Sequence, residues 1–251
     1  MERGREASVE LNHICQVEIR VKDLIPNAKY YAGTFSWKIN VVSEEYATID
    51  TGAAPVGGLL QIPPEGMPIG VSPYVLVEDC IATYEKAISL GAQRCLAPME
   101  LPGSGRYATV YDPDGTEISF WQADQPMGNQ FEGSGQNPFI WLEKPARDLA
   151  GNVGFYANLF GWNFTISPGV DDFAFCDSAD RAVGIGLVSG ERGELLRGNT
   201  VYVRVSDCEA TCERAVAAGG FVHVKPQPSH SGIFAVIVDP SGNPLAISQP
   251  A

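Results

Sequence analysis

Apolar and polar residues alternate along four short segments of the chain, and each segment ends in the pattern Val/Ala-x-Asp. A strand turns successive side chains to opposite faces, so each segment predicts a strand with one apolar and one polar face. In the first segment the apolar face holds Val17, Ile19 and Val21, and the polar face holds Gln16, Glu18 and Arg20. The four aspartates that end the pattern are Asp23, Asp79, Asp148 and Asp207. Four units of one design therefore follow each other.

A helical pattern follows each aspartate, and short apolar runs follow each helix. After Asp79, apolar residues recur at helical spacing as far as Gly91, which provides a stop signal. The later runs, such as residues 107–111, are separated by glycine and proline and predict further strands. Each unit is therefore predicted to be a βαβββ module.

The four modules form two copies of a pair. The turn DPDG at 112–115 recurs as DPSG at 239–242, and the stretch at 27–37 (NAKYYAGTFSW) matches 152–162 (NVGFYANLFGW). The polar, glycine-rich stretch 125–136 predicts a linker. We predict an α+β protein of two domains in tandem, at 9–124 and 137–250. Their modules span about 9–64, 70–124, 137–190 and 198–250.

The polar strand faces carry large side chains, which favours a lined cleft over a plain solvated face. Tyr74 and Tyr202 stand at the same count in two modules, and so do Glu18 and Glu143 in the other two. A solvated face of an antiparallel sheet alternates in the same way, and that interpretation stays open. The candidate ligand-binding residues are Gln16, Glu18, Arg20, Tyr74, Trp121, Trp141, Glu143, Tyr202 and Arg204.

Charge and composition exclude some classes of binding partner. The 251 residues carry a formal net charge of −13, which disfavours nucleic acid and anionic membranes. The longest apolar runs are too short for a membrane span, and the charged beginning does not resemble a secretory signal. Six cysteines without a CxxC pair fit reduced thiols, so we expect a cytoplasmic protein.

Four βαβββ modules, with FY…FGW after a first helix and DPDG before a last strand, resemble the vicinal-oxygen-chelate superfamily. That superfamily includes glyoxalase I, extradiol dioxygenases and bleomycin-resistance proteins. The likeness covers about residues 11–249 and is closest to the tandem glyoxalase/bleomycin-resistance-like proteins common in actinobacteria. It implies two glyoxalase-like domains in tandem, and it allows a homodimer.

The resemblance also points to the positions where the metal enzymes of the superfamily hold their ligands. In this chain those positions are Gln16, Ser72, Ser119, Trp141, Thr200 and Ala246. Gln16 is a type that glyoxalases use there, but a divalent metal needs three or four convergent donors. We therefore expect no metal and no cofactor, while an off-pattern set such as Glu18 with Glu117 stays open.

Bleomycin-resistance proteins bind a drug in an aromatic cleft without a metal, and the resemblance favours that function here. The expected ligand is a small organic molecule, aromatic or cationic, in a partly acidic cleft. One alternative is a metal-independent lyase- or isomerase-type enzyme of detoxification or secondary metabolism, with Glu18 or Glu143 as general base. Another is an interaction protein with a vestigial cleft. Module pairing and the number of binding domains stay open.

Overall fold

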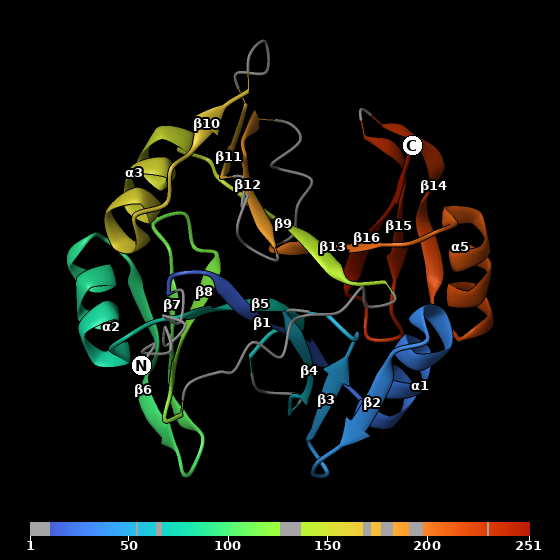
Figure 1. The fold of residues 1–251 in the computed structure, drawn as a ribbon, viewed down its shortest axis with the longest axis horizontal. Helices are drawn as coiled ribbons and strands as arrows, with labels where there is room; N and C mark the ends of the chain where they lie inside the picture. The colour runs from blue at the N-terminus through green and yellow to red at the C-terminus, as the bar shows by residue number, and fades with distance from the viewer. Residues whose placement is uncertain are drawn as a thin grey trace, which may run out of the picture.

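The computed structural model describes residues 11–53, 55–63, 67–125, 137–167, 172–176, 183–190, 198–229 and 231–251. These residues form two mixed sheets of eight strands each, together with four helices (Figure 1). The helices are α1 (Leu24–Phe35), α2 (Cys80–Ser89), α3 (Leu149–Phe160) and α5 (Cys208–Ala217). Among the described residues, none of the helices combines the length and the apolar character that crossing a bilayer requires.

The first sheet is built entirely from the first half of the chain. Its strands are β1 (Ile14–Val21), β2 (Lys38–Val41), β3 (Tyr46–Asp50), β4 (Val56–Gln61), β5 (Gly70–Leu76), β6 (Gln93–Leu101), β7 (Gly105–Tyr111) and β8 (Glu117–Ala123). They lie in the order β2-β3-β4-β1-β5-β8-β7-β6. The first two modules therefore pair with each other through β1 and β5, which run antiparallel.

The second sheet repeats this order with the second half of the chain. Its strands are β9 (Phe139–Pro145), β10 (Thr165–Ile166), β11 (Phe173–Cys176), β12 (Gly184–Val188), β13 (Thr200–Arg204), β14 (Phe221–Ser229), β15 (Gly232–Val238) and β16 (Pro244–Pro250). The order is β10-β11-β12-β9-β13-β16-β15-β14. The predicted α+β fold of two similar halves in tandem is confirmed.

The Val/Ala-x-Asp pattern marks the start of each helix. The side chains of Asp79, Asp148 and Asp207 each accept a hydrogen bond from the backbone N–H three residues later. This bond satisfies one of the amides that a helix leaves unpaired at its first turn. The side chain of Asp23 makes no such bond. The Gln61 side chain caps helix α1 instead, because its Oε1 accepts a hydrogen bond from the N–H of Leu24 at 2.8 Å.

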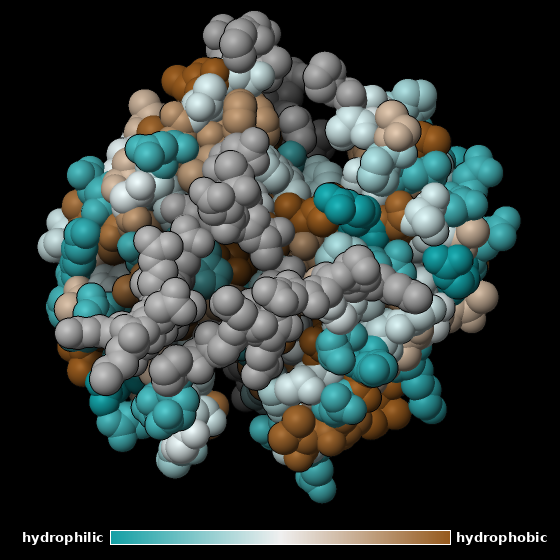
Figure 2. All heavy atoms as spheres, viewed as in Figure 1, coloured by the Kyte–Doolittle hydropathy of each residue, from teal (hydrophilic) through white to brown (hydrophobic). Residues whose placement is uncertain are grey.

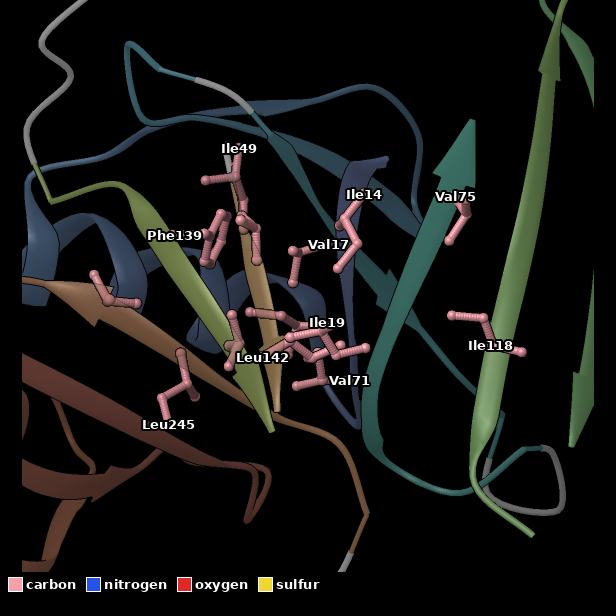
Figure 3. Packing of buried hydrophobic residues seen from close by; sticks show 14 of the residues in the cluster. Ile14, Val17, Ile19, Ile49, Val71, Val75, Ile118, Phe139, Leu142 and Leu245 are labelled. Atoms are coloured by element: carbon pink, nitrogen blue, oxygen red, sulfur yellow. The ribbon is translucent and has the colours of Figure 1, made fainter. Parts of the chain in front are cut away.

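The apolar core runs from one half into the other. The buried face of β1 packs in one cluster with Phe139 and Leu142 of β9 (Figure 3). The Trp37 and Phe139 rings lie 5.0 Å apart between centroids. Outside this core, helix α1 lies beside α5 and α2 lies beside α3, so each helix pair joins the two halves (Figure 1).

Reciprocal hydrogen bonds join the repeated FY…FGW motif of each half to the turn of the other. The Tyr31 hydroxyl donates to Asp239 Oδ2 at 2.8 Å, and the Tyr156 hydroxyl donates to Asp112 Oδ2 at 2.7 Å. The motif tryptophans also bond across the halves, because Trp37 Nε1 donates to the Asn137 carbonyl before β9 and Trp162 Nε1 donates to the Asn12 carbonyl before β1. The motif therefore holds the halves together, and the four bonds are termed the latch.

Lys144 is a charged residue on the apolar side of β9, and the structure accounts for it. Its ammonium donates to the Glu117 carbonyl at 2.6 Å and to Asn199 Oδ1 at 2.7 Å, and lies 3.7 Å from Asp112 Oδ2. The side chain is fully buried, and this desolvation lowers its pKa, against the opposing effect of Asp112 and Glu117. Lys144 thus belongs to the contact between the halves.

On the face shown in Figure 2, apolar residues gather over β2 and α1 at the lower right. Val41 and Val42 are 53% and 66% exposed there, and Ile25 on α1 is 49% exposed. Single exposed apolar residues of this kind are common on soluble folds.

Candidate functional site

A glutamate and a tyrosine meet on the polar face of the first sheet, and the same pair recurs in the second sheet. The Tyr74 hydroxyl donates to Glu18 Oε1 at 3.3 Å. In the other half the Tyr202 hydroxyl donates to Glu143 Oε2 at 2.8 Å. Both pairs bridge neighbouring antiparallel strands, β1 to β5 and β9 to β13. The alternation of strand faces in the sequence predicted that these four residues lie on the polar faces. The structure brings them together in two pairs.

Burial sets the protonation of Glu18. Only 8% of the residue is exposed, and desolvation raises its pKa from 4.5 to about 7, against the lowering effects of Arg20 and Tyr74. Burial and the nearby Glu18 carboxylate raise the pKa of Tyr74 as well. Near neutral pH the Glu18 carboxyl can therefore exchange a proton, while Tyr74 keeps its own.

Arg20 pairs with Glu117 rather than with Glu18. Arg20 Nη1 donates to Glu117 Oε1 at 2.8 Å, Nη2 contacts Oε2, and Nε donates to the Pro68 carbonyl at 2.8 Å. Both side chains are nearly buried, so this is a bidentate ion pair inside the protein. The Glu117 oxygens that an off-pattern metal set would use are thus bound to a guanidinium.

The positions that the resemblance assigns to metal ligands in the first half hold neutral groups, and two of them, Ser72 and Ser119, bond to each other. Ser119 Oγ lies 2.9 Å from Ser72 Oγ and 2.8 Å from Thr109 Oγ1. Gln16 Nε2 donates to the Tyr46 hydroxyl at 3.2 Å. Among the described residues, no group of three His, Cys, Asp or Glu side chains is placed to hold a metal ion. The hydroxyls of Ser72 and Ser119 and the amide of Gln16 do not fit the divalent ion that the metal enzymes of the superfamily use.

A cavity of about 400 Å³ opens beside Gln16 in the first half. Its walls include Gln16, Tyr46, Thr48, Asp50 and Gly57. Glycine is required at the neighbouring position 58, because a Cβ there would lie 2.6 Å from the Tyr46 hydroxyl oxygen. The alternation count did not find Tyr46, which comes from β3 rather than from a first strand.

In the second half a tryptophan occupies the position that Gln16 holds in the first. The Trp141 indole lies against the backbone of Gly184 and Gly186, where an added Cβ would come within 2.4 and 3.0 Å of its ring atoms. The Phe173 ring lies 6.4 Å from it between centroids. Trp141 remains half-buried and stands directly opposite Tyr202 in the sheet. Trp141, Phe173 and their glycine floor form an aromatic platform.

The remaining predicted residues, Trp121 and Arg204, belong to neither pair. Trp121 is half-buried and packs with Tyr107 against a small cluster that includes Tyr74. Arg204 is exposed at the end of β13, where its backbone N–H donates to the Pro138 carbonyl. Arg204 therefore differs from Arg20, which is buried.

The fold shows which proteins the chain resembles. It is the fold of the vicinal-oxygen-chelate proteins, with two similar halves in tandem. Residues 140–248 match the family described as glyoxalase-like domain. The predicted resemblance is thus confirmed.

Relatives over nearly the whole chain come from two bacterial genera. The chain is 29% identical to CFP32 of Mycobacterium tuberculosis, which carries a provisional glyoxylase name, over 94% of each chain. It is 26% identical to the anthracycline biosynthesis protein DnrV of Streptomyces peucetius, over 90% of this chain and 89% of DnrV.

Solved structures support the fold. The manganese-bound glyoxalase from Novosphingobium aromaticivorans superposes with a TM-score of 0.68 at 17% identity, covering 95% of this chain and 82% of that one. The 2,3-dioxygenase LapB from Pseudomonas sp. KL28 gives 0.63 at 14% identity, covering 95% and 93%.

Proposed function

We propose that the protein binds a small, planar aromatic molecule on the aromatic platform of its second half, without a resident metal. The ring stacks on the aromatic platform, and a hydroxyl or amino group of the ligand bonds to the Glu143–Tyr202 pair. Aromatic rings bury a large area on a flat tryptophan and prefer an offset stack.

The repeated glutamate–tyrosine pair carries this proposal. Glu18 and Tyr74 match Glu143 and Tyr202 in type and contact. The metal-ligand positions differ between the halves, because Gln16 and Ser119 become Trp141 and Ala246. Two halves that keep the pair and change the ligand positions favour a function that depends on hydrogen bonding rather than on a metal.

Two further observations support an aromatic ligand. Trp141 is half-buried, so part of its indole is exposed while its other side rests on glycine backbone. The similarity to DnrV fits as well, because that relative is named for anthracycline biosynthesis, and anthracyclines are planar polycyclic aromatics.

A second candidate is acid–base catalysis at Glu18. A carboxyl with a pKa of about 7 is suited to take and return a proton near neutral pH. Gln16 in the wall of the cavity shares a face of β1 with Glu18, and the Glu18 carboxylate is close enough to Tyr46 in the same wall to help raise the pKa of that tyrosine. The reaction class would be a metal-independent proton transfer, such as an isomerisation or elimination.

Titration with 1,4-dihydroxyanthraquinone tests the binding proposal. We expect saturable quenching of tryptophan fluorescence, and affinity lowered roughly tenfold in Trp141→Ala. Gln16→Ala changes the equivalent position of the other half and should leave the affinity unchanged. Circular dichroism of both variants controls for folding.

The outcomes separate the candidates. Loss of binding in Gln16→Ala with full binding in Trp141→Ala would move the site to the first half. Absence of saturation in every variant would contradict aromatic binding. A slow change in the ligand's absorption spectrum that Glu18→Gln abolishes would favour the catalytic alternative.

A further inference from the structure

We propose that a cavity between the two halves is a separate binding site for a neutral, multiply hydroxylated ring of monosaccharide size. The cavity has a volume of about 380 Å³, and residues at the starts of β5 and β13 are part of its wall. Its polar walls are Arg20, Tyr111 and Glu117 from the first half and Asn199, Thr200 and Asn243 from the second. This site does not depend on the aromatic cleft.

Equivalent residues of the two halves line the cavity together. Gly70 and Gly198 are equivalent residues of the two copies, and so are Thr116 and Asn243, and all four line it. The copies differ at Glu117, because its equivalent in the second half is Pro244. One wall therefore carries an ion pair and the facing wall an apolar ring. A sugar-like ring is likewise polar on one side and apolar on another, because hydroxyl groups surround its edge and C–H groups cover its faces.

Hydrogen-bonding capacity remains on both walls. Arg20 uses three of the five N–H groups of a guanidinium on Glu117 and the Pro68 carbonyl. Asn243 Nδ2 donates to the Arg20 carbonyl and to Asp239 Oδ2, both at 2.9 Å, which fixes the amide orientation. The Thr200 hydroxyl of the second half also lines the cavity and can both donate and accept a hydrogen bond.

These groups select a neutral ligand with hydroxyls. A ligand hydroxyl can accept from the guanidinium of Arg20, and a second one can bond to the Thr200 hydroxyl. Arg20 is already neutralised by Glu117, and Lys144 lies close to Asp112. A charged ligand would therefore bring an uncompensated charge into a buried site.

The test is a titration of the full-length, ¹⁵N-labelled protein, followed by ¹H–¹⁵N correlation spectra. The probes are methyl α-D-glucopyranoside, methyl α-D-galactopyranoside and myo-inositol, with tetrahydropyran as a ring without hydroxyls. The reporters are the amides of the four glycines in the cavity wall, Gly70, Gly115, Gly198 and Gly242. We expect saturable shifts at these amides with at least one hydroxylated probe and none with tetrahydropyran.

Two variants locate the binding. Ile69 lies at the cavity wall close to Gly242, so Ile69→Trp should fill the space and weaken binding at least tenfold. Ile25→Trp places the same bulk on the exposed side of α1 and should leave binding unchanged. If Ile69→Trp disturbs the fold, Thr200→Val removes one wall hydroxyl at nearly constant volume and should still weaken binding.

Three results would overturn the proposal. Shifts that never saturate would mean that the cavity holds water alone. Binding that survives in both Ile69→Trp and Thr200→Val would place the probe elsewhere. Shifts around Trp141 instead of the glycines would assign the sugar to the aromatic cleft. The anthraquinone titration has separate probes and variants, so either proposal can fail alone.

Discussion

Glu18 is buried beside a tyrosine, while Arg20, on the same face of β1, is held by Glu117. That arrangement leaves the carboxyl with a hydrogen bond but without an ion pair of its own. Desolvation then dominates and raises the pKa of Glu18 to about 7. The protonation of Glu18 therefore affects the free energy of unfolding.

Glu18→Gln should remove a pH dependence of stability. Between pH 4.5 and about 7 the folded protein keeps a proton on Glu18 that the unfolded chain releases, so its contribution to stability falls as pH rises. Above pH 7 the variant should be the more stable protein, by up to about 3 kcal/mol, and below pH 4.5 the gap should close. Urea unfolding at several pH values measures this difference.

The matched control is Glu78→Gln, which changes an exposed glutamate. Its stability should follow the wild type at every pH. A gap between Glu18→Gln and the wild type that is constant with pH would contradict the raised pKa.

Strand β12 contributes its backbone, rather than side chains, to the contact with Trp141. Gly184 and Gly186 expose backbone on the face where Trp141 lies, so the strand serves as a floor for an indole. In the first half, Gly58 of β4 does the same for Tyr46. Each sheet therefore carries an aromatic residue close to its backbone at the cleft.

Gly184→Ala should displace the Trp141 ring. The new methyl group would lie 2.4 Å from the indole, and the overpacking should destabilise the protein by about 1–3 kcal/mol. Thermal unfolding measures the loss, and the tryptophan emission spectrum reports the movement. Gly154→Ala in α3 meets no atom within 4 Å and should be neutral or stabilising. Equal effects of the two variants would contradict the contact between the Gly184 backbone and the Trp141 ring.

The sequence predicted part of this site. Alternation along a first strand depends on local geometry, so it placed Glu18, Tyr74 and Trp141 on the cleft face. Tyr46 and Phe173 come from the edge side of each sheet and reach the cleft through strand pairing, which the spacing along the chain does not contain. Arg20 and Glu117 are likewise 97 residues apart, and their pairing follows from the sheet order.

At the scale of the whole molecule, the halves share one core and four latch bonds. Tyr31 and Tyr156 each reach the turn aspartate of the opposite half. The turn and the helix motif were both visible in the sequence, but their contact spans 208 residues in the case of Tyr31 and Asp239. Sequence repetition indicated two similar units; it contained no sign that each unit holds the other.

The protein should unfold in one cooperative transition, because neither half has a closed core of its own. Tyr31→Phe and Tyr156→Phe should each lower stability by about 2 kcal/mol, since each removes a buried hydrogen bond to a carboxylate. Scanning calorimetry measures both effects. Tyr30→Phe is the matched control, because its hydroxyl donates to neither aspartate among the described hydrogen bonds. Two separate transitions, with one moved in each variant, would contradict the shared core.

The latch also has a consequence for how the two clefts can change. Contacts that occur twice across a two-fold axis are the isologous contacts of a symmetric pair of identical subunits. In such a pair, every substitution appears on both sides at once. Because a single chain encodes the two sides separately, one position can hold glutamine at 16 and tryptophan at 141. The covalent linkage thus preserves the symmetric interface while it frees the two clefts to specialise.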